Sequence, residues 1–165
     1  EKAIETAASS NGENVDVDLS GEKVTVKTAE GEATFQDGSM TMKSDDGSMV
    51  IGADAKVPAD FPKDVPMYSN VEMRSSSTQA EGDSKTVMVQ FLAKDAVAKV
   101  TEFYKKEAAA QGWSEETTFN QDGESPMSMM EYTKGDRRLS VMIAKEGEGA
   151  SVTITSQQPM GGASQ

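Results

Sequence analysis

The sequence predicts an α+β protein in which one helix packs on an antiparallel sheet, and three observations lead to this class. Between Asp95 and Gln111, apolar residues recur at three- and four-residue spacing, which is the period of an amphipathic helix. The stretches before and after this helix alternate apolar and polar residues, as half-buried strands do. A helix with one apolar stripe and a sheet with one apolar face each need a partner layer, so we expect them to cover each other.

Composition narrows the classes of function. The chain has 165 residues, 5% of them aromatic, so we expect one or two small domains with cores built from Val, Ala and Met. Its net charge of −12 would repel nucleic acids and anionic membranes. Cysteine is absent, which excludes disulfides, and no run approaches the roughly 20 apolar residues that span a bilayer. The chain begins at Glu1 without an initiator Met, so either an export signal was removed or the boundary is a trimmed one.

The first 53 residues form the first predicted unit, a short helix and a β-meander. Residues 1–10 read as the helix, which carries Ile4, Ala7 and Ala8 on one side and must dock on another element because ten residues are marginal alone. Five groups of alternating apolar residues then predict five strands: Val15, Val17 and Leu19; Val24 and Val26; Ala33 and Phe35; Met40 and Met42; and Met49, Val50 and Ile51. Gly-containing hairpin turns separate them. One face of this meander is apolar, so we expect the short helix, the second domain or another copy to cover it.

Residues 54–70 hold three prolines, Pro58, Pro62 and Pro66, and predict an extended linker rather than a helix or a central strand. Its apolar residues are expected to pin it to the neighbouring sheet: Phe61, Val65, Met67 and Tyr68. A partner-binding polyproline motif is the other interpretation, which we disfavour because the PxxP pairing is missing.

Residues 71–157 form the second predicted unit, a ββαββββ domain. Its strands are expected at residues 71–77, 84–92, 114–120, 127–133, 137–144 and 150–156. The helix should begin with Asp95 as its N-cap and end at Gly112, and Trp113 should close the core. Residues 158–165 are rich in Gly and Ser and predict a flexible tail.

Several sequence stretches resemble a group of uncharacterised bacterial secreted proteins and lipoproteins. They are DFPKDVPMYSN, FYKKEAAAQGW and DRRLSVMIAKEGEGASVTITSQ, preceded by the acidic VDVDLSGEKVTVKTAEGEATF. The resemblance covers about residues 14–157 and implies an exported protein, with any lipid-anchoring cysteine upstream of Glu1. That group carries no established catalytic residues, so the resemblance implies none here.

Catalytic and metal-binding patterns are weak. Histidine is absent, which removes the usual base of nucleophilic catalysis and the commonest metal ligand. Ser20 and Lys23 have S-x-x-K spacing, but on a predicted turn rather than a helix. Acidic groups recur at Asp16/Asp18, Asp37, Asp45/Asp46 and Asn120/Asp122/Glu124. None completes a Ca²⁺ loop, so we do not expect a Ca²⁺ site, and we assign no catalytic, cofactor or metal residues.

Methionines are frequent and suggest two interpretations. Thioethers suit Cu(I), but the alternation explains Met40 and Met42 as ordinary core residues. On the strand at 127–133, Met127 and Met129 share one face while Met130 and Tyr132 share the other, so that strand is either buried twice or meets a partner.

The pattern therefore favours a non-catalytic exported protein of the cell envelope or extracellular space. One form of it self-assembles through β-sheet edges into a filament or other homopolymer. The alternative is a monomeric lipoprotein-type module that binds an unknown ligand or partner. An enzyme that uses carboxylates, or a small-ligand carrier, is the least favoured hypothesis, because no residue can be nominated for it.

Overall fold

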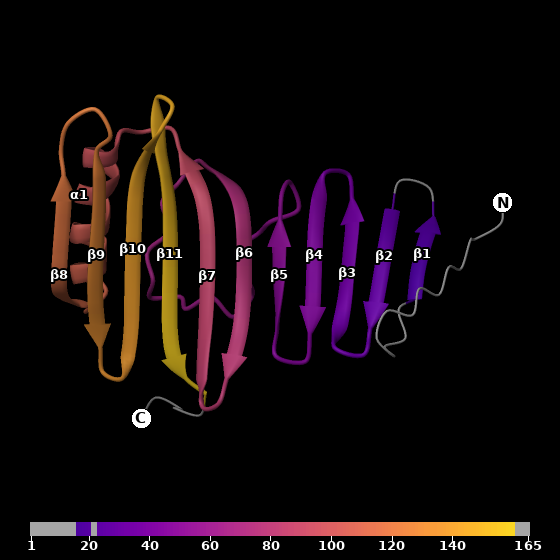
Figure 1. Cartoon of the computed structure of the whole chain (residues 1–165). Helices are drawn as coiled ribbons and strands as arrows, with labels where there is room; N and C mark the ends of the chain where they lie inside the picture. The colour runs from indigo at the N-terminus through magenta and orange to yellow at the C-terminus, as the bar shows by residue number, and fades with distance from the viewer. Residues whose placement is uncertain (1–15, 21–22, 161–165) are drawn as a thin grey trace.

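The computed structural model describes residues 16–20 and 23–160, which form one antiparallel sheet of eleven strands with a single helix on one face (Figure 1). The strand order across the sheet is β1-β2-β3-β4-β5-β6-β7-β11-β10-β9-β8. The strands are β1 (Asp16–Ser20), β2 (Lys23–Thr28), β3 (Gly31–Gln36), β4 (Ser39–Ser44), β5 (Gly47–Ile51), β6 (Val71–Glu81), β7 (Ser84–Ala93), β8 (Ser114–Gln121), β9 (Met127–Lys134), β10 (Arg137–Glu146) and β11 (Gly149–Pro159). The helix predicted at residues 1–10 lies outside the described residues, as do residues 161–165 of the predicted tail.

The predicted fold class, a helix and meander followed by a separate ββαββββ domain, is wrong. Strand β5 pairs with β6 from Gly47–Gln79 to Ile51–Ser75, so the sheet continues from the meander into the rest of the chain. The chain leaves the sheet after β5 and returns as the next strand across, although nineteen residues of sequence lie between Ile51 and Val71. Alternation predicts that a stretch is a strand, but it does not say which strands become neighbours.

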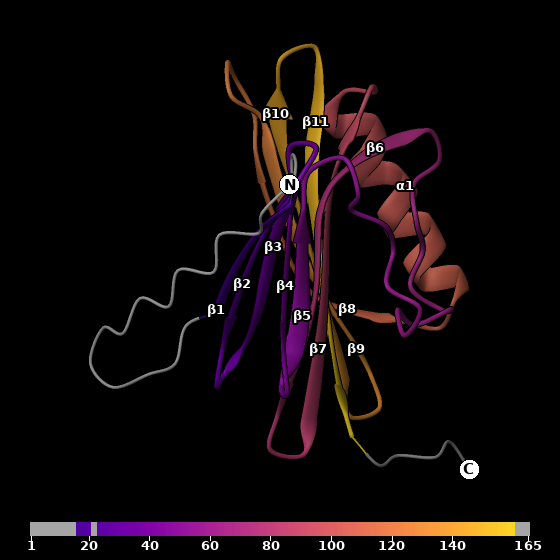
Figure 2. The same ribbon diagram turned by 90° about the vertical axis from the view of Figure 1, so that its right-hand side faces the viewer.

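Helix α1 (Val97–Ala110) lies across β8 to β11 on one face of the sheet (Figure 2). Its buried stripe is Val97, Val100, Thr101, Tyr104 and Ala108. These side chains pack on inward-facing residues of β7, β9, β10 and β11: Val87, Val89, Phe91, Met130, Tyr132, Leu139, Val141, Ile143, Val152 and Ile154. This is the hydrophobic core of the described chain.

The two ends of α1 differ from each other in how they are capped. The N-cap is Ala96, with no side-chain cap, so the predicted N-cap role of Asp95 is wrong. Asp95 instead accepts hydrogen bonds from the Tyr68 hydroxyl and the Lys99 ammonium, each at 2.7 Å. The predicted end is confirmed, because Gly112 has φ +81° and the Trp113 amide donates back to the Ala108 carbonyl at 3.0 Å.

The proline-rich segment lies on the same face of the sheet as the helix (Figure 2). Phe61 and Val65 are buried in the core, and Met67 and Tyr68 pack against it while partly exposed. The predicted anchors of this segment are therefore confirmed. Tyr68 also meets the edge of the Phe103 ring, with 4.9 Å between ring centroids.

The apolar side of the sheet changes from one face to the other between β5 and β6. In β7, Val87 and Val89 point into the core under the helix, while Met88 between them points to the opposite face. Met88 pairs with Ser77 of β6, which pairs with Met49 of β5. Directly paired residues share a face, so the apolar side of the meander faces away from the helix.

Candidate interaction surface

A row of ten paired residues crosses the helix-free face without a single charge. Each residue lies directly opposite the next in the strand pairing, from β2 to β8: Val24, Phe35, Met40, Ile51, Ser75, Gln90, Thr153, Met142, Met129 and Phe119. We call this row the uncharged belt. Its two ends are apolar and its middle, on β6, β7 and β11, is polar. At a strand spacing of about 4.8 Å it is about 43 Å long.

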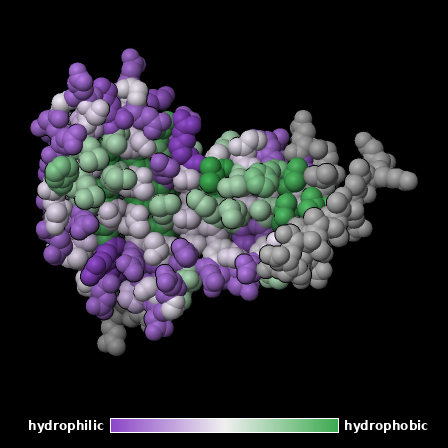
Figure 3. Space-filling view, viewed as in Figure 1, coloured by the Kyte–Doolittle hydropathy of each residue, from purple (hydrophilic) through white to green (hydrophobic). Residues whose placement is uncertain are grey.

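The apolar ends of the belt are exposed. Phe35 is 45% exposed and Met129 is 37% exposed, and Figure 3 shows apolar side chains gathered at both ends of this face. Strands β2 to β5 contribute no apolar residue to the buried core, whose first member in the chain is Ala55. No described helix or strand packs on this face of the meander, although its apolar side chains all lie there except Val50.

Charged residues of the meander strands lie on the opposite face. Lys23, Lys27, Glu32 and Lys43 alternate with the apolar residues and so point to the helix side of the sheet. Lys27 and Glu32 form an exposed ion pair at 3.3 Å. This separation of charge from apolar area gives the two faces of the meander opposite chemistry.

A shallow groove of about 740 Å³ lies beside the belt. Its floor includes apolar side chains of β2, β3, β4, β5 and β7: Val26, Ala33, Met42, Met49 and Met88. Residues of the β2–β3 and β4–β5 turns and of β6 complete it, among them Glu30, Asp46 and Ser77. Its size is that of a small-molecule site, and thioether side chains adapt readily to the shape of a bound group.

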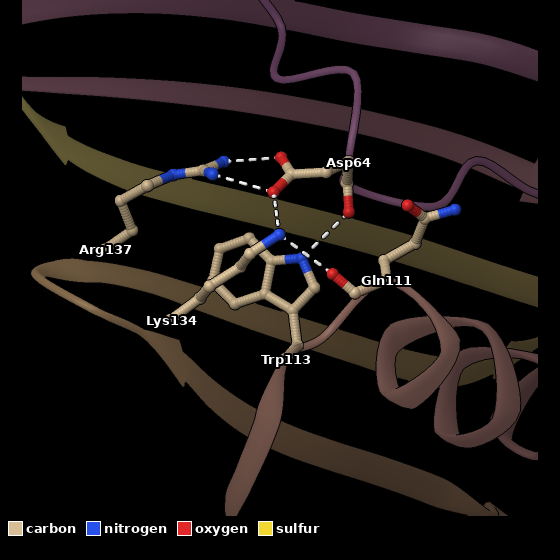
Figure 4. A network of polar contacts seen from close by, with 5 residues as sticks. All are labelled: Asp64, Gln111, Trp113, Lys134 and Arg137. Atoms are coloured by element: carbon tan, nitrogen blue, oxygen red, sulfur yellow. Dashed lines mark hydrogen bonds and ion pairs between the residues drawn. The ribbon is translucent and has the colours of Figure 1, made fainter. Parts of the chain in front are cut away.

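A network of polar contacts fastens the proline-rich segment to the rest of the fold (Figure 4). The Asp64 carboxylate accepts two hydrogen bonds from the Arg137 guanidinium, at 2.7 and 2.8 Å, and one from the Lys134 ammonium at 2.7 Å. Lys134 also donates to the Gln111 carbonyl at 2.8 Å, and the Trp113 indole N–H donates to the Asp64 carbonyl at 2.8 Å. The Arg137 guanidinium lies 4.8 Å from the centroid of the Trp113 ring.

The network is structural in character. Hydrogen bonds from Arg137, assisted by Lys134 and opposed by partial burial, lower the pKa of the Asp64 carboxyl from 3.8 to about 2. A carboxylate with such a low pKa stays ionised at neutral pH and is a poor base. Trp113 is buried and closes the core, as the sequence predicted.

Buried tyrosines are equally unsuited to proton transfer. Burial raises the pKa of Tyr132 to about 12, and the hydroxyl of this residue contacts the Met130 sulfur at 3.2 Å. Burial also raises the pKa of Tyr104, which is fully buried. Both hydroxyls therefore remain protonated at neutral pH.

The candidates raised by the sequence do not come together. Ser20 and Lys23 are the paired ends of β1 and β2, which is not the helical setting that S-x-x-K chemistry requires. Asp37 lies in the β3–β4 turn, while Asp45 and Asp46 lie in the β4–β5 turn. Within residues 16–20 and 23–160, no three His, Cys, Asp or Glu side chains gather into a group that could hold a metal ion. The helix that these residues contain is too short to cross a membrane.

The prediction that Met40 and Met42 are ordinary core residues is wrong. Met40 is only partly buried and Met42 is 44% exposed, because both lie on the helix-free face. On β9, Met130 and Tyr132 are buried under the helix, whereas Met129 is 37% exposed on the other side. Of the two interpretations of this strand, burial on both faces is therefore wrong within the described chain, and contact with a partner stays a prediction. The belt itself was not predicted, because it exists only through the pairing of ten strands.

Residues 73–161 match the model of a protein family described as START domain-like. The matched region begins within β6 and runs past β11, so it contains the helix and most of the core but none of β1 to β5. No curated protein and no solved structure matches the chain. The apolar end of the belt on β2 to β5 is thus an addition outside the matched region.

Proposed function

We propose that this chain, which belongs to the START domain-like family, is a non-catalytic protein that works by binding a partner through its uncharged belt. The observation that carries the proposal is that β2 to β5 give no apolar residue to the core and turn these residues to a face that no described element covers. Exposed contiguous apolar area of this kind marks interaction sites in proteins. Asp64, Tyr104 and Tyr132, whose pKa values are strongly shifted, are poor acids or bases at neutral pH, which favours binding over catalysis.

The belt can be tested with a neutral apolar dye such as Nile red. At a concentration where light scattering shows monomers, the wild-type chain should bind the dye, and Phe35→Ser should bind several-fold less because its exposed ring is removed. Thr34→Ser is the matched control, since Thr34 directly precedes Phe35 in β3 and points to the other face. Equal dye binding by wild type and Phe35→Ser would show that this face is not available in solution, and the proposal would fail.

We further propose that the protein is exported to the cell envelope or the extracellular space, as its resemblance to secreted proteins and lipoproteins implies. Its acidic composition and lack of cysteine are compatible with this location. Fractionation of the native cells with an antibody against the chain tests it. Recovery of the chain in the cytoplasmic fraction alone would contradict this location.

The alternative is a monomeric binding module of lipoprotein type, and the groove beside the belt favours it. A small apolar ligand would contact Met42, Met49 and Met88 there. Met42→Asp together with Met88→Asp should then abolish ligand binding without altering the mass of the particle. Retained affinity in this variant would eliminate the groove as the ligand site.

Assembly through strand edges into a filament is a less favoured form of the proposal. Within the described sheet, β1 and β8 are the outermost strands, and β8 carries two adjacent acidic residues, Glu115 and Glu116, both exposed. Charged residues on an edge strand disfavour its pairing with a strand of another chain, and more so when that chain is also acidic. Negative-stain imaging tests this form directly, because regular filaments would reinstate it.

A further inference from the structure

We infer that the partner of the uncharged belt is a second copy of this chain, packed face to face about a two-fold axis that runs parallel to the strands between β6 and β7. This inference rests on the proposed function, because it names the occupant of the same surface. The order of the belt residues, the distribution of charge and the area of the face favour this occupant.

The order of residues along the belt is complementary to the belt of a second copy whose strand order runs in the opposite direction. A two-fold axis between β6 and β7 places each belt residue of one copy over the mirror position of the other. The resulting pairs are apolar at both ends and polar at the centre: Val24 over Phe119, Phe35 over Met129, Met40 over Met142, Ile51 over Thr153, and Ser75 over Gln90. Every apolar residue except Ile51 faces another apolar residue, and Ile51 faces a threonine, which carries a methyl group.

The charge distribution also favours a copy of the same chain. Two chains of net charge −12 repel each other over most of their surfaces, and a basic partner would be drawn to those acidic surfaces rather than to the belt. The belt has no charge to repel a copy or to attract a basic partner. A face-to-face contact at the belt therefore lets two acidic chains approach without burying an unpaired charge in this row.

The area is sufficient for a weak dimer. Ten strands at about 4.8 Å, with about four residues of each strand in contact, cover about 650 Å² per copy, or about 1,300 Å² in total. This footprint extends beyond the belt to the next row on the same face, in which Glu131 of β9 is the one charged residue. Specific interfaces begin at about that total, so we expect a dimer that dissociates on dilution rather than an obligate one. Figure 2 shows the described strands as a single twisted layer with the helix on the side away from the belt, so no described helix lies on the belt side.

Charge reversal across the axis tests the inference on the full-length chain. Phe35→Lys places a lysine opposite Met129 of the second copy, and Met129→Glu places a glutamate opposite Phe35 of the second copy. Because of the two-fold symmetry, each substitution changes two contacts in the dimer. Each single variant should weaken the dimer at least about tenfold by light scattering across a dilution series, because it buries an unpaired charge. The double variant should recover the dimer, since each new lysine then faces a new glutamate. Thr41→Lys, on the opposite face of β4, should leave the dimer unchanged.

Cross-linking locates the axis. The chain has no cysteine, so one introduced thiol is unique. Ser77→Cys lies beside the axis, and a bis-maleimide of about 10 Å, the spacing of packed sheets, should join two copies through it. Ala33→Cys lies far from the axis and Ser48→Cys lies on the other face, so neither should give a dimer.

Three results would overturn the inference. The first is a monomer of 17.6 kDa at all concentrations; if that monomer still binds Nile red through Phe35, the proposed function survives and only the second copy is excluded. The second is failure of the double variant to recover the dimer that the single variants lose. The third is cross-linking of a photoreactive group on Ala33→Cys to residues 1–15 of the same chain, because the N-terminal segment rather than a second copy would then cover the belt.

Discussion

Replacing Asp64 with asparagine removes the charge that Arg137 and Lys134 surround, while the shape of the side chain is kept. The Asp64 side chain is 25% exposed, and the difference between a pKa of 3.8 and one of about 2, at about 1.4 kcal/mol per pH unit, is worth about 2 kcal/mol of folding stability. Because the folded pKa is the lower one, this stabilisation is present above the unfolded pKa and is lost as the pH falls through the folded pKa. Wild type should therefore exceed Asp64→Asn by about 2 kcal/mol at pH 7.

The assay is urea unfolding followed by the fluorescence of Trp113, the single tryptophan, whose indole N–H contacts Asp64. The gap between wild type and Asp64→Asn should be constant from pH 7 to about pH 5 and should close between about pH 4 and pH 2. Asp122→Asn, in the exposed turn after β8, is the control and should match wild type throughout. A gap that does not change with pH, or no gap at pH 7, would refute the assignment of this stability to the ionised carboxylate.

Four further substitutions test the packing at concentrations that give monomers, the first three by their unfolding free energies and the fourth by amide exchange. Ile143→Ala in the fully buried core should cost about 3 kcal/mol, whereas Met42→Ala on the open face should cost less than about 1 kcal/mol; similar costs would mean that the open face is covered in the monomer. Gly112→Ala should cost about 1 kcal/mol, because Gly112 has φ +81°, and an unchanged midpoint would show that the helix end rearranges without strain. Gly47→Val should detach β5 from β6, since a Cβ at Gly47 would collide with the Thr78 carbonyl. We expect β2 to β5 to lose amide protection while Trp113 fluorescence stays unchanged, and protection that remains in β2 to β5 would refute this prediction.

Local elements could be predicted from the sequence because local rules determine them. Alternation and turn residues together placed the described strands, and the left-handed position at Gly112 placed the end of the helix. The buried anchors Phe61 and Val65 were predicted because apolar residues in a proline-rich segment have few other places to go. In these cases the physical cause lies within a few residues of the feature.

Non-local pairing could not be predicted in the same way. The alternation of Met40, Met42 and Met49 is compatible with either face of a sheet, and the choice depends on β5 meeting β6 with Met49 opposite Ser77. A shift of one residue in that register would have turned the same methionines toward the helix side. The uncharged belt follows from nine such pairings, so no stretch of sequence contains its signal.

Because no buried core lies under β2 to β5, these strands should unfold and refold differently from the helix-covered part of the sheet. Each of these strands packs mainly against the strands beside it, so its stability derives from its neighbours in series, as in a repeat protein. Amide hydrogens should therefore exchange progressively faster from β5 outward to β2, while those of β7, β10 and β11 exchange only on global unfolding. The folding order should run the other way, with the helix-covered strands forming first and the outer hairpins adding to their edge one after another.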